Sequence, residues 1–382
     1  RTINILLIKD GEIIPIRKND RKMRVSHLMS YFKNNGYKTS WVTSNFLHSQ
    51  RTFIKNKDLN INKNIILLKS IGYFNNKSPR RLIHTLLFSL KLFFFLVKRI
   101  RNYSHIYISY PTPESLFPTI FLTNLFKIPL IIDVRDVWPP EIKNGLIYFL
   151  YNKLTIFIMR RIQNKSKLYL LSVSEGLEIW FTKTFPSLIP VSSSICPIGC
   201  DEEFHGKIVK KKKEINIIYV GSLGINYDVT GMVKSLLSIN LKEYINIHIV
   251  GNGEQFNKLK EMSSLRSNIK MYGFLNKKII KNIASNCDIG LVPHKIDDLL
   301  PNKVGEYLCS GLFIISTIKG KCAELIKTNK VGFTVDREYK SIKKALFEYK
   351  NLDKQNLLEN TQKIYNSDFL TKNVYTRKLN KL

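Results

Sequence analysis

Acidic residues are scarce in this chain. Its 382 residues include 29 aspartates and glutamates against 61 lysines and arginines, which gives a formal net charge of +32. Such an excess of positive charge is typical of proteins that bind a polyanion, either a nucleic acid or an anionic membrane surface. A composition rich in Lys, Asn and Ile produces the same excess when lysine is simply the common polar residue. The sequence leaves both explanations open.

Cysteines and long apolar runs are scarce as well. Among the five cysteines, Cys196 and Cys200 have C-x3-C spacing with no second Cys or His pair nearby, so we expect no zinc or other metal site. An odd, unpatterned set of cysteines suits a reducing cytoplasm. No stretch reaches the ~18 apolar residues that span a bilayer. No signal peptide precedes the apolar segment at 3–8, so we expect a cytoplasmic protein.

Residues 79–101 come nearest to a membrane segment. Their apolar centre, Leu86 to Val97, contains Lys91, and basic residues stand on both sides of it. The stretch is too short and too interrupted to span a bilayer. It is either a core helix packed on a sheet, or a helix that presents Phe93 to Phe95 and the flanking cations to an anionic membrane.

The length of the chain predicts two domains. Short apolar segments, which indicate buried strands, alternate with segments of helical periodicity in both halves. This alternation predicts two Rossmann-like, doubly wound parallel sheets facing a central cleft, an α/β fold class. Residues 186–204 hold three prolines and lack periodicity, so we expect an interdomain connection there, and a second α/β cycle after the Lys210–Lys213 run.

The stretch 297–311 holds the strongest candidate site. Pro301 suits the first position of a helix and Gly311 suits the position just after its end, which predicts a helix of roughly three turns from about Asn302. On this helix Lys303 shares a face with Glu306 and Tyr307. A lysine at a helix N-terminus favours phosphate, and a carboxylate further along can take two hydroxyls of a sugar ring. The alternative is a surface helix with an internal Lys–Glu pair.

Polar and glycine-rich residues follow other strands. Arg135 and Asp136 come directly after the strand at 129–134, where ligands bind in open α/β sheets, although a simple ion pair at the strand end would look the same. Gly221-Ser222-Leu223-Gly224 closes the strand at 215–220, and Gly251 begins the turn after the strand at 245–250.

The order and spacing of these segments resemble a GT-B glycosyltransferase of family 4, of the type that builds bacterial surface polysaccharides. The resemblance covers nearly the whole chain. In the second half it rests on IYVGSLG, IHIVGNGEQFNKL, IKMYGFL, CDIGLVPH, LPNKVGEYLCSGLFIIST and AELIKTNKVGF, and in the first half on NNGYKTSWVTSNF, IIDVRDVWPPE and SVSEGL. CPIGCDEEF is similar to the family's Asn-Gly-Val-Asp stretch, with Ile198 for Asn and Cys200 for Val.

The resemblance implies a division of labour. Residues 1–190 would bind the acceptor, residues 191–365 would bind the nucleotide sugar, and a C-terminal helix at 366–382 would return to the first domain. The family's Glu-x7-Glu pair falls on Asp298, one methylene shorter than Glu, and on Glu306, which matches the ribose-binding position. The donor would be held by Gly221, Ser222, Leu223, Gly224, Gly251, Lys303, Glu306 and Tyr307.

Two departures from the family pattern bear on the chemistry. Residues 221–228 lack the Arg and Lys that neutralise the diphosphate in many members, which leaves Lys303 as the candidate side chain for this role. Where many members have His beside Asp, this chain has Arg135 beside Asp136. Arginine is not a general base, so we expect Arg135 to bind a phosphate or carboxylate of the acceptor instead. Asp136, Arg135 and Asp298 are the candidate catalytic residues.

The resemblance implies a retaining transfer from a nucleotide-diphosphate sugar, most simply a UDP-sugar, to a lipid-linked glycan, without a metal or other cofactor. It places the enzyme at the inner face of the cytoplasmic membrane, with residues 79–101 touching the lipid. The same fold would also suit a nucleotide-sugar epimerase or a phosphorylase. A nucleic-acid-binding protein, suggested by charge alone, has no supporting motif.

Overall fold

The computed structural model describes residues 3–15, 22–48, 51–55, 64–74, 78–138, 146–200, 202–207, 214–239 and 245–379. The polar stretch Lys9–Arg24 is a loop that we expect to contribute to acceptor specificity, and its residues 16–21 lie outside these ranges. The Lys210–Lys213 run lies outside them as well. The chain forms two compact units. One comprises Arg1–Pro197 with Tyr375–Leu382, and the other comprises Ile198–Val374.

The first unit is built on a parallel sheet of seven strands, in the order β5-β2-β1-β6-β7-β8-β9. These strands are β1 (Asn4–Ile8), β2 (Lys38–Ser44), β5 (Ile65–Leu68), β6 (His105–Tyr110), β7 (Leu130–Val134), β8 (Leu168–Ser172) and β9 (Ser192–Ile195). A two-stranded hairpin, β3 (Phe46–Leu47) with β4 (Thr52–Phe53), stands apart from the sheet. The helices are α1 (Arg24–Asn34), α2 (Pro79–Arg99), the 3-10 turn η2 (Ile100–Asn102), α3 (Pro113–Phe126), α4 (Leu146–Met159) and α5 (Glu175–Thr184).

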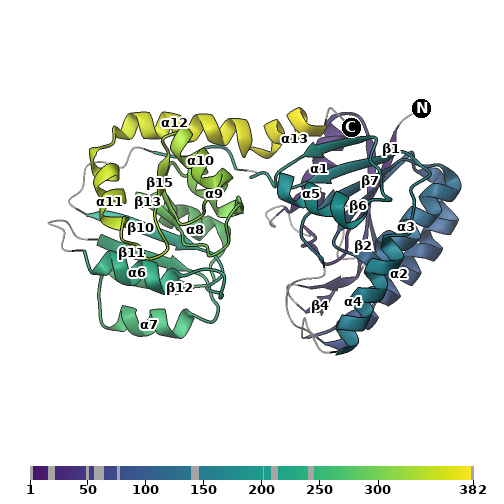
Figure 1. The fold of residues 1–382 in the computed structure, drawn as a ribbon, viewed down its shortest axis with the longest axis horizontal. Coiled ribbons are helices and arrows are strands. Elements are labelled where there is room, and N and C mark those ends of the chain that lie inside the picture. The colour runs from purple at the N-terminus through teal and green to yellow at the C-terminus, as the bar shows by residue number, and fades with distance from the viewer. Residues whose placement is uncertain are drawn as a thin grey trace. The chain divides into compact units, whose positions relative to one another are not determined.

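The second unit is built on a parallel sheet of six strands, in the order β12-β11-β10-β13-β14-β15. The strands are β10 (Ile215–Val220), β11 (Ile245–Val250), β12 (Ile269–Gly273), β13 (Ile289–Val292), β14 (Phe313–Ser316) and β15 (Gly332–Thr334). The helices are α6 (Val229–Leu237), α7 (Phe256–Ser264), α8 (Lys277–Ala284), α9 (Asn302–Cys309), α10 (Lys321–Thr328), α11 (Ile342–Asn351) and α12 (Lys354–Asp368). α13 (Thr371–Leu379) ends the described chain and carries it into the first unit (Figure 1).

The apolar segments become strands because helices cover both faces of each sheet. In a sheet buried on both sides, every position of a strand favours an apolar residue. β7 illustrates this, since all five of its residues are buried. The predicted α/β class with two Rossmann-like parallel sheets is confirmed.

The strand order of the second unit fixes where a ligand can bind. The strand sequence runs outward from β10 in one direction and from β13 in the other. The crevice outside the carboxyl ends of the two strands where the order reverses is the usual ligand site in open α/β sheets. Gly221 follows β10 directly, and the segment leading to α9 follows β13.

Two local features differ from the sequence-based expectation, and a third decides between two interpretations. β9 lies inside the stretch 186–204 that we expected to be a connection. The strand was not predicted because its residues, Ser-Ser-Ser-Ile, show no apolar alternation. The apolar pattern from Leu146 predicts a helix as far as Gln163, but α4 ends four residues earlier, at Met159. α2 packs on the sheet through Phe88, Leu92 and Leu96, which favours the core-helix interpretation for that face of the helix. None of the helices described is long and apolar enough to traverse a bilayer.

Candidate functional site

The turns after β10 and β11 cross at a point where only glycine fits. Gly221 has φ 141° and Gly251 has φ 149°, both in the region that side chains avoid. A Cβ on Gly251 would lie 1.8 Å from the carbonyl oxygen of Gly221. The N–H of Gly221 donates to the Val250 carbonyl at 2.9 Å, and that of Gly251 donates to Gly273 at 2.7 Å. The floor of this edge of the sheet is therefore main chain packed on main chain.

The rest of the first turn is held by hydrogen bonds to the second. The N–H of Leu223 donates to Asn252 at 2.9 Å, and the Gln255 side chain donates to the Gly224 carbonyl at 2.9 Å. Leu223 is buried in the core, so this residue contributes only its backbone to the surface of the turn. Ser222 is exposed beside it.

α9 begins and ends close to the predicted positions. Pro301 is the N-cap rather than the first helical residue, and the helix begins at Asn302. Gly311 has φ 73°, the left-handed conformation that ends many helices, as predicted. The helix has eight residues, which is shorter than the three turns expected.

Lys303 is buried between two tyrosine rings. Its Nζ lies 4.1 Å from the ring centre of Tyr219 in β10 and 3.9 Å from that of Tyr227. A Cβ on Gly221 would lie 3.0 Å from this Nζ, so the ammonium group reaches the glycine turn. Lys303 is 8% exposed, and its Nζ has no hydrogen-bond acceptor in the described part of the chain. Aromatic faces stabilise a cation but do not accept its three N–H bonds, so this side chain is poised for an anion.

Burial lowers the pKa of Lys303 from 10.5 to about 7, and the nearby carboxylate of Glu306 acts in the opposite direction. Glu306 is half-buried one turn further along α9. The two residues thus share a face as predicted, but the lysine belongs to a buried site rather than to a surface ion pair. Sequence reasoning missed Tyr219 and Tyr227. The only signal for them was an aromatic residue on each side of the glycine turn.

Tyr307 lies in the core rather than at the surface of the site. It is 2% exposed. Its hydroxyl accepts the N–H of Val220 at 2.9 Å and donates to the Leu291 carbonyl at 3.3 Å. It thereby ties β10 to β13 next to the glycine turn. The structure gives this candidate donor-binding residue a positioning contact with the backbone.

Asp298 is exposed and adopts a left-handed conformation with φ 56°, which Asp tolerates better than most residues. Its carboxylate lies against Gly320 at the start of α10, where a Cβ would come within 1.8 Å of Oδ1. The neighbouring Asp297 is instead engaged by protein groups, since its Oδ1 pairs with Arg337 at 2.8 Å and accepts the N–H of Lys319 at 2.9 Å.

Arg135 and Asp136 belong to the first unit and follow β7. Arg135 pairs with Glu12 at 2.5 Å. Burial acts to lower the pKa of the Arg135 guanidinium, but the nearby Glu12, Tyr107 and Asp133 raise it above its ordinary value. Asp136 is exposed, and its Oδ1 accepts the N–H of Val137. The strand-end ion pair considered for Arg135 therefore exists, with Glu12 as a partner that sequence reasoning did not identify.

A second buried ion pair in the first unit was also missed. Asp133, inside β7, receives two hydrogen bonds from Arg24 of α1, at 2.6 and 2.8 Å, and a third from the hydroxyl of Tyr107. Arg24 and Asp133 are fully buried. Their separation of 109 residues in the sequence gives no local pattern that could reveal the pair.

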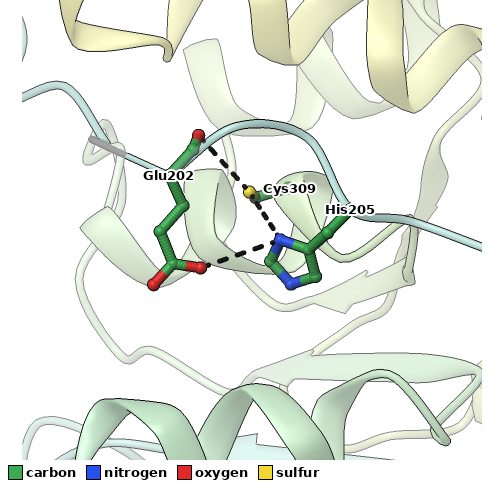
Figure 2. Close-up of side chains that lie close together, drawn as sticks. All are labelled: Glu202, His205 and Cys309. Carbon is green, nitrogen blue, oxygen red and sulfur yellow. Dashed lines mark hydrogen bonds and ion pairs between the residues drawn. The ribbon is translucent and has the colours of Figure 1, made fainter.

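A third cluster fastens the segment that follows Ile198 to α9. Figure 2 shows Glu202 and His205 of this segment facing Cys309 of α9. His205 Nδ1 lies 3.4 Å from the Cys309 sulfur and 3.7 Å from Glu202 Oε2. Residues of these types bind metals, but the carboxylate already pairs with Lys277 at 3.0 Å, and burial raises the pKa of the Cys309 thiol to about 11. The donor set therefore does not suit a cation, and we interpret it as a structural junction.

The second unit matches a known family. Residues 201–364 match the family model described as "Glycosyl transferases group 1". No curated protein sequence matches the chain.

Solved structures resemble the chain over almost its whole length. Alr3699/HepE of Anabaena, in complex with UDP and glucose, has 13% identity and a TM-score of 0.63, covering 98% of both chains. A glycosyltransferase from Rickettsia africae ESF-5 has 14% identity and a TM-score of 0.66, covering 99% of this chain and 97% of its own. WaaG, a glycosyltransferase involved in lipopolysaccharide biosynthesis, has 14% identity and a TM-score of 0.64, covering 98% of both chains.

At such low identity these structures establish only the fold. The family match assigns residues 201–364, within the second unit, to the glycosyl transferases group 1. The chain therefore has the GT-B fold and is a glycosyltransferase with a group 1 domain at residues 201–364.

Proposed function

We propose that the chain is a retaining glycosyltransferase of family 4 that uses a UDP-sugar and transfers its sugar to a lipid-linked glycan during bacterial surface polysaccharide synthesis. Two observations from other proteins support this choice. HepE was solved with UDP and with UDP-glucose, and WaaG is described as acting in lipopolysaccharide biosynthesis. The sequence motifs of the polysaccharide-building subgroup point the same way.

Lys303 carries the proposal. Breaking the bond between a sugar and a nucleoside diphosphate places negative charge on the leaving phosphate, and the reaction is fastest where preorganised cations and N–H groups receive that charge. The buried ammonium of Lys303 has no acceptor of its own among the described residues, and it reaches the main chain of the glycine turn. A diphosphate bound there would supply the missing acceptors. No metal ion is needed in this scheme, because the lysine provides the positive charge.

The other candidates take separate roles in binding the two substrates. Glu306, on the same face of α9, would accept the ribose hydroxyls, and Asp298 would accept hydroxyls of the transferred sugar. Arg135 would meet a phosphate or carboxylate of the acceptor while Glu12 holds its guanidinium in place. Asp136, exposed after β7, would contact the acceptor hydroxyl. The transition state has oxocarbenium character, so the site must stabilise the leaving group more than it must activate the nucleophile.

The acceptor determines where the enzyme works. A lipid-linked glycan is presented at a membrane, so we propose that the chain acts at the inner face of the cytoplasmic membrane and contacts it through residues 79–101. The excess of cations over acids in the chain favours association with an anionic surface.

The test is sugar transfer by purified variants. Lys303→Ala and Glu306→Ala should fold normally and lose transfer, with a decrease in kcat on the order of 10²–10³ for the lysine. Lys354→Ala is a matched control, because Lys354 is a half-buried lysine that packs on Tyr349. The Tyr349 hydroxyl donates to Asp288, directly before β13 and thus at the opposite end of that strand from α9.

Near wild-type turnover of Lys303→Ala would refute the assignment. Incubation with the UDP-sugar alone separates the alternatives, since an epimerase changes the sugar without any acceptor.

A further inference from the structure

Three neighbouring helices of the first unit leave large apolar side chains in solvent. α2 packs against α3, and α3 packs against α4, as Figure 1 shows. The exposed apolar residues on these helices define what we call the three-helix surface. They are Ile83, Leu86, Leu90, Phe94 and Val97 of α2, Phe117, Phe121 and Leu125 of α3, and Phe149, Leu150, Leu154, Phe157 and Ile158 of α4.

α2 is apolar on two opposite faces. Phe88, Leu92 and Leu96 are buried against the sheet, whereas the exposed residues at positions 83, 86, 90, 94 and 97 recur every three or four residues. This spacing places them in one stripe along the side of the helix that faces away from the core. Packing within the unit explains the first face and leaves the second face without a partner among the described residues.

A row of cations runs beside this stripe. Arg80, Lys91 and Lys98 are separated by 11 and 7 residues, which at 3.6 residues per turn brings all three to nearly the same angle around the helix. All three are exposed. The helix thus presents an apolar stripe with a basic edge, the pattern of helices that lie in a membrane interface.

α3 extends the surface in the middle. Its other sides are covered, and only the line formed by Phe117, Phe121 and Leu125 is open. Glu114, the only acidic residue in the three helices, is withdrawn from this surface. Its Oε1 accepts hydrogen bonds from Thr85 of α2 at 3.3 Å and from Tyr151 of α4 at 2.5 Å. One carboxylate therefore fixes the three helices to one another and adds no negative charge to the apolar lines.

α4 and the turn that follows it repeat the combination of aromatic rings and cations. Lys153 Nζ lies 5.6 Å from the ring centre of Phe149, and the Arg161 guanidinium lies 3.5 Å from that of Phe157. A cation held over an exposed ring can remain at the level of lipid headgroups while the ring enters the acyl region.

We propose that the three-helix surface, rather than α2 alone, is the membrane-docking face of this enzyme, and that its occupant is an anionic lipid bilayer. The charge of the surface favours an anionic bilayer over a second copy of the chain. The three helices contain one acidic residue, Glu114, and six basic residues: Arg80, Arg81, Lys91, Lys98, Arg99 and Lys153. Two such surfaces from copies of the same chain would repel each other, whereas an anionic leaflet attracts each cation and buries the rings. The inference extends the proposed membrane location and does not depend on which sugar is transferred.

Vesicle binding of the full chain tests the apolar part. Phe94, Phe121 and Phe157 are 55%, 55% and 54% exposed, so their replacement by Ser leaves the core intact. The triple variant should bind vesicles containing phosphatidylglycerol on the order of a hundredfold more weakly than the wild type. The matched control is Leu265→Ser, Phe274→Ser and Phe347→Ser in the second unit, whose targets are even more exposed and should not matter.

The charged part has its own variants. Replacing Arg80, Lys91 and Lys98 by Gln should weaken binding by a similar factor at low salt, and added salt should reduce the difference. The control replaces Lys258, Lys260 and Lys270, which are exposed lysines of the second unit.

Several results would overturn the proposal. One is that the wild type binds vesicles of pure phosphatidylcholine as tightly as vesicles containing phosphatidylglycerol. Another is that either control variant loses as much vesicle binding as the variant it is matched to. A third is that the protein self-associates without lipid and that the phenylalanine substitutions abolish this association. UDP binding, measured on the same variants, should be unchanged. A failure of docking is thereby distinguished from a failure of the proposed donor site.

Discussion

Raising the pH should release the nucleotide from this enzyme through Lys303. Burial lowers the pKa of this lysine to about 7 in the ligand-free protein. A bound diphosphate would restore a pKa close to or above the ordinary value, because an adjacent anion favours the charged form. Binding above pH 7 must then take up a proton. The dissociation constant for UDP should therefore increase with pH.

The magnitude follows from the fraction of protein that carries the proton. For a pKa of about 7 in the free protein, the Kd should rise about tenfold per pH unit above about pH 8, and about fiftyfold between about pH 7 and pH 9. The second ionisation of a phosphate lies near pH 6, so the charge of the ligand changes little above pH 7.

Folding responds to pH with the opposite sign. The folded protein holds Lys303 at a lower pKa than the unfolded chain does. Between about pH 7 and pH 10.5 the unfolded state therefore binds more protons, so this group makes the free energy of unfolding larger as pH rises. Loss of UDP binding at high pH would not reflect unfolding caused by Lys303.

Isothermal titration calorimetry with UDP, in buffers of different ionisation enthalpy, measures both the Kd and the proton uptake. Lys303→Met should bind UDP weakly and with little dependence on pH, whereas Lys354→Met should keep the wild-type profile. Lys354 is an informative control because its pKa is also lowered, to about 8. A wild-type Kd that stays constant between pH 7 and pH 9, or an unchanged slope in Lys303→Met, would refute the reasoning.

Three further substitutions test the supports of the site. Gly251→Ala should destabilise the second unit by about 3 kcal/mol or more, because a Cβ would overlap the Gly221 carbonyl at an unfavourable φ; a urea midpoint equal to that of the wild type would contradict the crossing. Tyr307→Phe should cost about 1–3 kcal/mol in urea unfolding by leaving the Val220 N–H unsatisfied, and UDP contact with the hydroxyl would be indicated instead if affinity fell while stability did not. Asp133→Asn should cost about 3–5 kcal/mol in thermal or urea unfolding, since Arg24 would remain buried without a counter-charge; an unchanged transition would show that the pair is not needed for the fold.

Much of the fold was predictable because its information is local. Strands such as 215–220 and 289–292 are buried on both faces and are therefore continuous apolar segments. Each can be recognised in the sequence without knowledge of the strands beside it. Gly311 likewise marks the end of α9 through a backbone conformation that few other residues adopt. β9 was missed for the complementary reason, since Ser192–Ile195 is an edge strand held by pairing with β8 and carries little apolar signal.

The candidate site was predictable in its position and only partly in its environment. Lys303 was assigned correctly to α9, but its burial depends on Tyr219 and Tyr227, roughly 80 residues earlier in the chain. Tyr307 shares its helical face, yet its hydroxyl goes to the backbone of β10. Helical spacing predicts which side chains lie on one face of a helix, but it does not predict which residues from other elements contact them.

The crossing of Gly221 and Gly251 constrains how this enzyme can be altered. Because the carbonyl of one turn occupies the space that a side chain on the other would need, the floor beneath the proposed diphosphate offers no position for new chemistry. A change in donor preference, whether engineered or natural, would have to come from side chains around this floor. Ser222 and Ile225, exposed on the first turn, are the positions where a library would sample new contacts without loss of the fold.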